Sequence, residues 1–146
     1  MTAPAPVSRD DYAGLVTRLT GLVVDVGLLT LAGLAVGSLP GLAWEQVLGE
    51  RPSWVAKAAG AVAAALPWAY FTTAWTLTGH TFGGRLVGVR TLRSDGRRLS
   101  ARRAAVRALV GLLFAVVWLV GLVATLTDER RRAWHDRVFD TVVRRG

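Results

Sequence analysis

A single acid, Asp25, lies inside the first long apolar segment of the chain, and Arg18 precedes it by seven residues. A charged side chain at the centre of a membrane helix costs about 2.5–3.5 kcal/mol on insertion scales, so such residues usually face a bundle interior or a water-filled cavity. Seven residues are two helical turns, which places Arg18 on roughly the same face as Asp25 without ensuring contact. The pair would either line an ion or proton path, or fix the bundle with Asp25 bound to an arginine of another helix.

A second charged cluster, His135-Asp136-Arg137, lies near the end of the chain. We expect Asp136 to pair with Arg18 or with a loop arginine at the membrane surface, and a carboxylate flanked by arginines stays ionised. The alternative is a solvated charged face with a local salt bridge, and this is the interpretation we favour for His135 by itself. His80, at the end of the second apolar segment, belongs to the residue type that titrates near neutral pH; a lone histidine at such a place is more often structural.

Other chemistry has little support in the sequence. Two distant histidines without any cysteine are too few for a metal site, and disulfides are excluded. The stretch Gly79–Arg85 is rich in glycine but lacks the lysine and the spacing of a phosphate-binding loop. No nucleophile elbow or catalytic triad is evident. We therefore expect no enzyme activity, no metal and no cofactor.

The composition indicates one small membrane domain. The chain has 146 residues, is 52% hydrophobic and only 19% charged, and a soluble domain of this size would struggle to bury so much apolar surface. Its net charge of +8 comes almost entirely from arginine. Because this basic excess adjoins segments of lipid-compatible length, the expected partners are anionic lipid head groups and not nucleic acid.

Three apolar segments, at about residues 15–39, 54–77 and 108–126, are long enough to cross a hydrocarbon core of about 30 Å. The first is expected to end at Ser38–Gly41, before a polar loop flanked by the interfacial aromatics Trp44 and Trp54. Residues 1–12, which come before the first apolar segment, are expected to be mobile. Residues 13–145 are expected to form the membrane domain.

Small residues recur at four-residue spacing in the first two segments, which places them on one face of each helix. Such spacing lets helices approach closely, so the two faces are expected to pack together. The residues are Gly33, Gly37 and Gly41 in the first segment, and Ala56, Gly60 and Ala64 in the second.

The basic stretch 78–107 carries eight arginines against the single acid Asp95. The positive-inside rule places this loop, and with it the N-terminus, in the cytoplasm. Ser100 would cap a helix beginning at Ala101. Three arginines of that helix are expected to contact lipid phosphates: Arg102, Arg103 and Arg107.

The basic tail, residues 128–146, adds six arginines against four acids, and a full third span would place these charges outside. Leu86–Leu92 and Asp140–Arg144 both have strand character, and they can pair only on one side of the membrane. We therefore favour a third segment that is re-entrant or strongly tilted, with Gly111 and Gly121 allowing a bend. The expected fold is an all-α membrane protein with three hydrophobic helical segments and a short cytoplasmic strand pair.

Taken in order, these features resemble the RDD family of membrane proteins, which is named for one arginine and two aspartates. Arg18 and Asp25 match the arginine and aspartate of its first helix, and Asp136 matches the second aspartate. Further matches are Thr78–Arg90, Asp95-Gly96, Ser100, Arg103, Arg107, Ala133–Arg137 and Thr141–Val143. The chain departs from the family at Gly84, where a lysine is usual. The resemblance implies a bacterial multi-pass membrane protein that transports unidentified ligands, with sodium–proton exchange proposed for some members.

Two functions are consistent with these residues. The first is a small cation or proton transporter, or a transport subunit, in which Asp25 binds the ion while Arg18 and Asp136 tune it. Because three short segments cannot easily enclose a pathway, it requires a homo-oligomer or a membrane protein partner. The second is a non-enzymatic scaffold or assembly factor whose Arg18, Asp25 and Asp136 form a structural lock. DNA binding has only the net charge in its favour.

Overall fold

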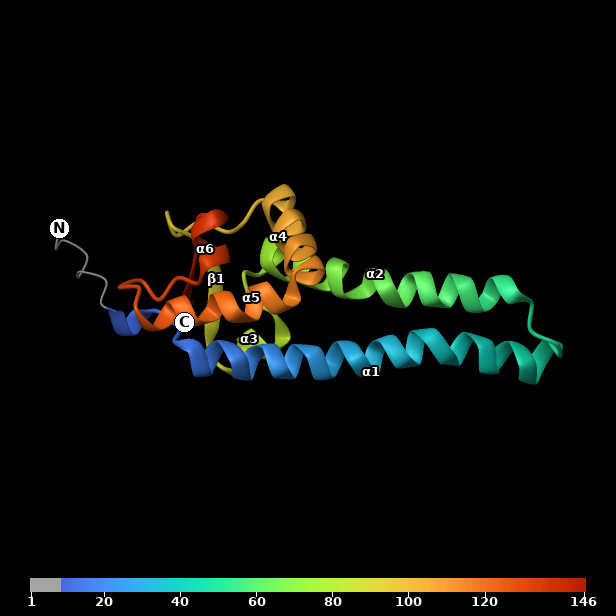
Figure 1. Cartoon of the computed structure of the whole chain (residues 1–146). Helices are drawn as coiled ribbons and strands as arrows, with labels where there is room; N and C mark the ends of the chain where they lie inside the picture. Colours follow the sequence, from blue (N-terminus) through green and yellow to red (C-terminus); the bar gives the residue numbers. More distant parts are fainter. Residues whose placement is uncertain (1–8) are drawn as a thin grey trace.

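A computed structural model describes residues 9–146 as a long helical hairpin followed by a bent helix and a two-stranded sheet (Figure 1). Residues 1–8 of the segment expected to be mobile lie outside the described residues. The elements, in chain order, are η1 (Arg9–Asp11), α1 (Leu15–Leu48), α2 (Ser53–Leu77), α3 (Phe82–Leu86), β1 (Val89–Arg93), α4 (Ala101–Leu113), α5 (Ala115–Gly121), η2 (Leu122–Leu126), α6 (Trp134–Val138) and β2 (Thr141–Arg145).

Helices α1 and α2 run side by side as an antiparallel hairpin, and α1 extends well beyond its expected end (Figure 1). The prediction that Ser38–Gly41 terminates the helix is wrong, because α1 continues through Pro40 to Leu48. A proline removes only one backbone donor, and apolar helices of membrane proteins tolerate that loss. The connection between the helices therefore shrinks to a few residues, and the Trp44 and Trp54 rings meet edge to face, 5.5 Å apart.

The small-residue faces of α1 and α2 do not pack against each other. A Cβ atom built on Gly33, Gly37 or Gly60 would meet nothing within 4 Å, and one on Gly41 would meet the Arg51 side chain. The expectation of close packing between these faces within one chain is therefore wrong. The two helices contact each other through other residues, and the glycine faces remain open.

The structure does not confirm three membrane segments. Among residues 9–146 only α1 is long and apolar enough to cross a membrane, and a second candidate arises only if α4 and α5–η2 count as one broken span. These two pieces meet at an angle of 102°. The break lies at Phe114, whose backbone leaves the helical range, and not at Gly111 or Gly121. The bend agrees with our preference for a third segment that does not run straight across.

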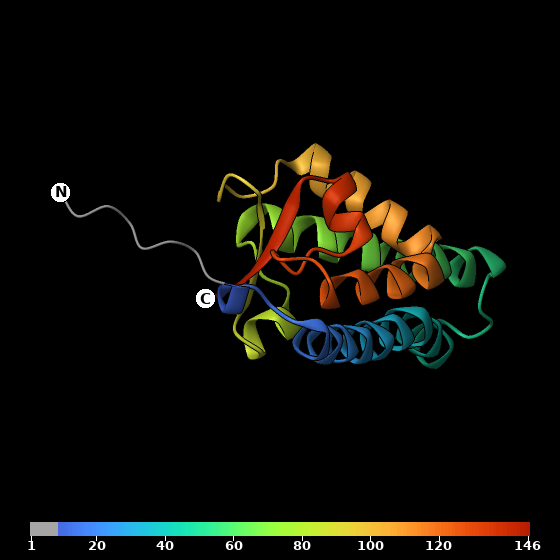
Figure 2. The ribbon, with the colours of Figure 1, turned by 60° about the vertical axis from the view of Figure 1, so that its left-hand side comes forward.

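Strands β1 and β2 pair antiparallel, with Val89 opposite Arg145 and Arg93 opposite Thr141. This confirms the expected strand pair, shifted slightly along the chain. Tyr12 forms a bridge to Arg144 and is buried, so the ordered domain includes the end of the segment expected to be mobile. As a result, the start of α1, the sheet and the C-terminus all lie at one end of the molecule (Figure 2).

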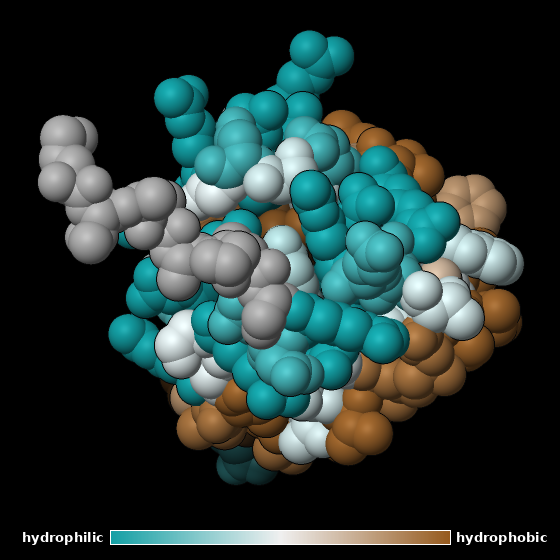
Figure 3. Space-filling model, turned by 90° about the vertical axis from the view of Figure 1, so that its left-hand side faces the viewer, coloured by the Kyte–Doolittle hydropathy of each residue, from teal (hydrophilic) through white to brown (hydrophobic). Residues whose placement is uncertain are grey.

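We call this end, formed by η1, β1, β2 and α6, the polar end. Hydrophilic side chains cover it, and hydrophobic side chains appear around its rim (Figure 3). Along the rest of the molecule large apolar side chains are exposed on α1, α2, α4 and α5, among them Val23, Leu31, Val62, Leu113 and Val116. Such a continuous apolar surface is unusual for a soluble monomer and suits a lipid environment.

Candidate functional site

Asp136 is fully buried and joins two arginines that come from distant helices. Its Oδ2 accepts a hydrogen bond from Arg18 Nη1 of α1, and its Oδ1 accepts one from Arg107 Nη2 of α4 at 2.8 Å. Thr141 Oγ1 of β2 lies 3.2 Å from the same Oδ1 atom. The expected pairing of Asp136 with Arg18 is therefore present, and Arg107 is a second arginine partner of the same carboxylate. We call Arg18, Asp136 and Arg107 the buried charge cluster.

The short helix α6 presents Asp136 to this cluster. Its carboxylate also accepts a hydrogen bond from the backbone N–H of Ala133, 3.1 Å away, which caps the first turn of α6. Arg18 is held equally firmly, because its Nε donates to the Ala13 carbonyl at 3.0 Å and its Nη2 to the Arg131 carbonyl at 2.6 Å. The cluster thus ties α1, α4, α6 and β2 together.

The electrostatics of Asp136 favour the ionised carboxylate. Burial alone raises the pKa of Asp136, but the positive charges of Arg18 and Arg107 outweigh this effect and hold it well below its usual range. The cluster of two guanidinium groups and one carboxylate therefore carries a net charge of +1. Such a group is expensive to bury and is kept only when its hydrogen bonds are made.

His135 lies beside the cluster and is buried, so the solvated charged face that we favoured for it is wrong. Its ring stacks on Trp118, with the ring centroids 3.6 Å apart. Burial lowers the pKa of His135 to about 3; the neighbouring charges of Arg107 and Arg18 add to this effect, and Asp136 opposes it. The guanidinium of Arg107 itself lies 5.0 Å from the centroids of both Trp75 and Trp118.

This histidine makes stability depend on pH. The pKa of His135 is lowered from 6.5 to about 3 on folding, so the unfolded chain takes up the proton first. Stability is therefore complete above about pH 6.5 and is lost as the pH falls toward 3. His135→Gln is expected to flatten this slope above pH 5, whereas His80→Gln, at the other histidine, should retain it. Melting temperature against pH in detergent checks this, and equal slopes for His135→Gln and the unaltered chain would contradict it.

Asp25 occupies a separate place in the structure, away from Arg18. Its Oδ1 atom accepts hydrogen bonds from the Tyr70 hydroxyl at 2.6 Å and from the Gly83 backbone N–H at 2.7 Å. Tyr70 in turn accepts from the Phe82 N–H at 2.7 Å. Within residues 9–146 no arginine forms an ion pair with Asp25. Neither the considered Arg18–Asp25 pair nor a pair between Asp25 and an arginine of another helix is therefore present among these residues.

Helix α3 supplies the N–H that reaches Asp25, and it does so because glycine lets it approach α1. A Cβ atom on Gly83 would collide with the Gly21 carbonyl oxygen and would lie 3.0 Å from the Asp25 carboxyl carbon. Thr81 is the N-cap of α3, and its hydroxyl accepts a hydrogen bond from the Gly84 N–H at 2.9 Å. Gly84 is buried here, and a larger residue would have to displace that hydroxyl.

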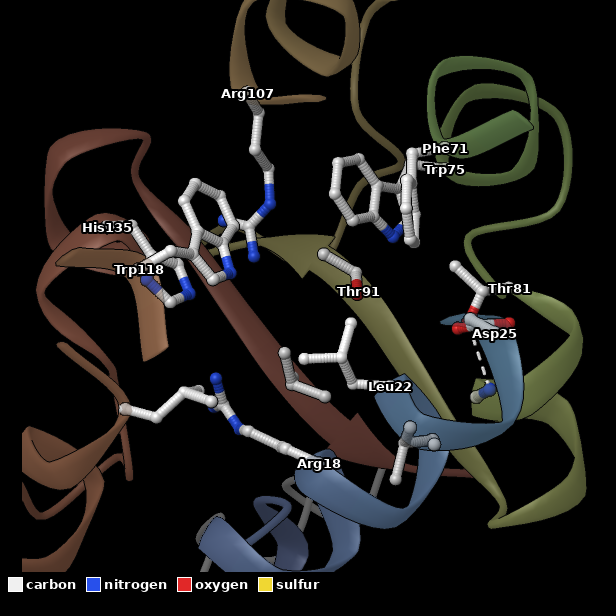
Figure 4. A pocket seen from close by; sticks show the side chains of 15 residues that line it. Arg18, Leu22, Asp25, Phe71, Trp75, Thr81, Thr91, Arg107, Trp118 and His135 are labelled. Carbon is white, nitrogen blue, oxygen red and sulfur yellow. Dashed lines mark hydrogen bonds between the residues drawn. The ribbon is translucent and has the colours of Figure 1, made fainter. Parts of the chain in front are cut away.

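A cavity of about 100 Å³ lies between Asp25 on one side and the buried charge cluster on the other. Figure 4 shows Asp25 and Thr81 facing Arg18, His135 and Trp118 across it, with Leu22 between them and Arg107 entering from another side. The structure thus gathers the predicted residues Arg18 and Asp25 around one cavity although they do not touch. Asp136 lies behind the arginines.

The arginines expected at lipid phosphates have different environments. Arg102 is exposed. Arg103 donates to the Phe139 carbonyl at 3.2 Å and lies 3.5 Å from Asp140. Arg107 is only 3% exposed, so the predicted contact of Arg107 with phosphates at the bilayer surface is wrong. Its place on the inward face of amphipathic α4 turns it toward Asp136 instead.

Sequence reasoning missed several residues of the site. Tyr70, Trp118, Thr141 and the Gly83 N–H received no role. One signal was available: the pair Gly83-Gly84, two residues after Thr81, indicates a close approach of the backbone to another element. Over residues 9–146 no group of three or more histidine or acidic side chains is placed to hold a metal ion.

Comparison with known proteins gives one match. A family model described as "RDD family" matches residues 12–140, which include both parts of the site. No curated protein and no solved structure matches the chain.

Proposed function

The chain belongs to the RDD family, and on that premise we propose that it is a multi-pass bacterial membrane protein that works as a subunit of a cation or proton transporter. The family and the long apolar helix α1 indicate a membrane protein. The α1–α2 hairpin returns the chain to the polar end, where the sheet and the C-terminus also lie. Their many arginines favour a cytoplasmic position for this end, and with it for the N-terminus and loop 78–107.

The observation that carries the transport proposal is the environment of Asp25. This carboxylate is 3% exposed, lies in α1 and meets two neutral donors at Oδ1. None of residues 9–146 donates a hydrogen bond to its Oδ2 atom. A buried acid without a cationic partner, beside a cavity, is suited to take up and release a proton or a small cation. The buried charge cluster would hold the surrounding helices in place and would not bind the ion itself.

One hairpin and one bent helix cannot enclose a pathway, so the proposal includes association with further copies of the chain or with a membrane protein partner. The exposed apolar faces of α1 and α2 supply surface for such contacts. The open Gly33 and Gly37 positions allow another helix to approach α1 closely. The exposed Arg102, with other arginines of the polar end, would contact anionic lipids.

Asp25→Asn is expected to lower cation or proton flux in proteoliposomes at least about tenfold, because the amide can neither bind nor release a proton at that site. Glu45→Gln is the matched control: it also removes one carboxylate, but in an exposed position at the far end of α1, and should leave flux unchanged. Flux of Asp25→Asn equal to that of the unaltered protein would exclude this role for Asp25.

A scaffold or assembly factor remains the second candidate, and the buried charge cluster favours it. All three nitrogens of Arg18 are engaged by protein groups, as a purely structural lock would require. This candidate predicts no flux through the purified protein and a lower folded yield for Asp25→Asn. An exchange of charges between Arg18 and Asp25 should not restore that yield, because the two side chains do not pair.

A further inference from the structure

A recess lies along the α1–α2 hairpin, on the side that faces α4 and α5. It consists of the cavity beside Asp25 and two further cavities of about 210 and 320 Å³ that share walls with their neighbours. Leu22, Phe71 and Trp118 line both the first cavity and the second, and Val26, Phe71 and Leu112 line both the second and the third. Because each cavity adjoins the next at these residues, we treat the three as one recess, which we call the furrow.

The furrow changes from polar to apolar along its length. At one end Asp25 faces Arg18 and Arg107. At the other end the walls are almost entirely apolar, with Val26 and Leu29 from α1, Pro67 from α2 and Leu112 from α4. A recess with a few charged groups at one end and an apolar remainder fits a molecule that has a polar head and a hydrocarbon tail.

The direction of this change agrees with the orientation of a lipid. The Trp44–Trp54 pair marks the membrane boundary at the far end of the hairpin. A hydrocarbon core of about 30 Å corresponds to about 20 helical residues, which places the opposite boundary near Val24 in α1 and Ala74 in α2. Asp25 and Trp75 thus lie at the level of lipid head groups, and the apolar end of the furrow lies inside the hydrocarbon core.

The charged groups at the Asp25 end of the furrow determine which kind of lipid head group fits there. One wall offers the Asp25 carboxylate, whose Oδ2 receives no hydrogen bond from the described residues and which has no ion-pair partner among them. The other wall offers the buried charge cluster with its net charge of +1. A head group that carries an ammonium group and a phosphate matches both walls, whereas a purely anionic head group would meet Asp25 unfavourably. A primary ammonium also provides N–H donors for Oδ2.

We propose that the furrow binds one phospholipid with a primary ammonium head group, of the phosphatidylethanolamine type. Its ammonium lies at Asp25, its phosphate faces Arg18 and Arg107, and one acyl chain follows Val26, Phe71 and Leu112 toward the bilayer centre. This assignment rests on the shape and charge of the furrow and does not depend on transport; a lipid ammonium at Asp25 would have to leave before a transported cation could bind the same carboxylate. A bound lipid also separates the site from the surrounding bilayer.

The test is native mass spectrometry of the full chain released from nanodiscs that contain phosphatidylethanolamine, phosphatidylcholine and phosphatidylglycerol in equal amounts. We expect one retained lipid per chain with a preference for phosphatidylethanolamine. Val26→Trp, which fills the furrow, should abolish retention. Val23→Trp is the matched control, because Val23 lies on the same helix, is 69% exposed and does not line the furrow.

Asp25→Asn tests the head group separately from the chain. It should reduce the preference for phosphatidylethanolamine over phosphatidylcholine about fivefold, as loss of one N–H hydrogen bond to the carboxylate would, because both head groups are cationic and only the primary ammonium can donate. Retention of a lipid should persist. Equal retention of all three lipids, a preference for phosphatidylglycerol, or retention unchanged by Val26→Trp would overturn the proposal. A chain that retains no lipid, whether as a monomer or as a dimer, would also overturn it.

Discussion

Asp136→Asn is expected to lower the free energy of unfolding by about 3–5 kcal/mol, the range measured when one partner of a buried ion pair is removed. Asparagine keeps the shape of the side chain but loses its charge. Arg18 and Arg107, both buried, would then repel each other without a compensating carboxylate. The measurement is chemical or thermal unfolding in detergent, together with the yield of monodisperse protein.

The matched control is Asp140→Asn, which removes the same group from a second site with two arginine neighbours. Asp140 approaches Arg93 and Arg103 at 3.9 and 3.5 Å, but its side chain is 51% exposed. Exposed ion pairs contribute about 0–1 kcal/mol, so this variant should unfold almost as the unaltered chain does. Similar losses for Asp136→Asn and Asp140→Asn would show that burial of the cluster does not matter to stability.

Gly83→Ala is expected to destabilise the protein by about 3 kcal/mol, at the upper end of the usual cost of overpacking. The added Cβ atom would collide with the Gly21 carbonyl of α1, and backbone atoms cannot move aside as a flexible side chain can. Helix α3 would have to withdraw, which would also remove the Gly83 N–H from Asp25. Unfolding in detergent measures the loss.

Gly60→Ala serves as the control for this variant. Gly60 lies inside α2 and a Cβ atom there meets nothing within 4 Å. Alanine is a better helix former than glycine by about 1 kcal/mol, so this variant should be slightly more stable than the unaltered chain. A Gly83→Ala protein as stable as Gly60→Ala would mean that α3 does not contact α1 as the structure shows.

Much of the architecture follows from local sequence. The apolar runs predict α2 almost residue for residue and the start of α1, because hydrophobic length and turn residues are local properties. The strand pair follows from the strand character of Leu86–Leu92 and Asp140–Arg144. Asp136, which follows a histidine in an arginine-rich tail, was expected to pair with Arg18 or with a loop arginine. Such charge pairing is predictable in kind because burying an ionised carboxylate is costly unless a cation or hydrogen-bond donors compensate it.

The tertiary structure decided which partner each charged residue takes. Arg18 and Asp25 lie on roughly the same helix face. Arg18 nevertheless pairs with Asp136 of α6, while Asp25 accepts hydrogen bonds from Tyr70 and from the Gly83 N–H of α3. These contacts join residues separated by 118, 58 and 45 positions, and no local pattern encodes such distances. The bend at Phe114 likewise depends on packing, since it turns Trp118 back over Arg107 and His135. Sequence alone therefore determined an apolar hairpin with a few charged side chains that need hydrogen-bond or ion-pair partners. Only the packed structure decided that Arg107 is buried and that, among residues 9–146, no donor reaches the second carboxylate oxygen of Asp25 beside the furrow.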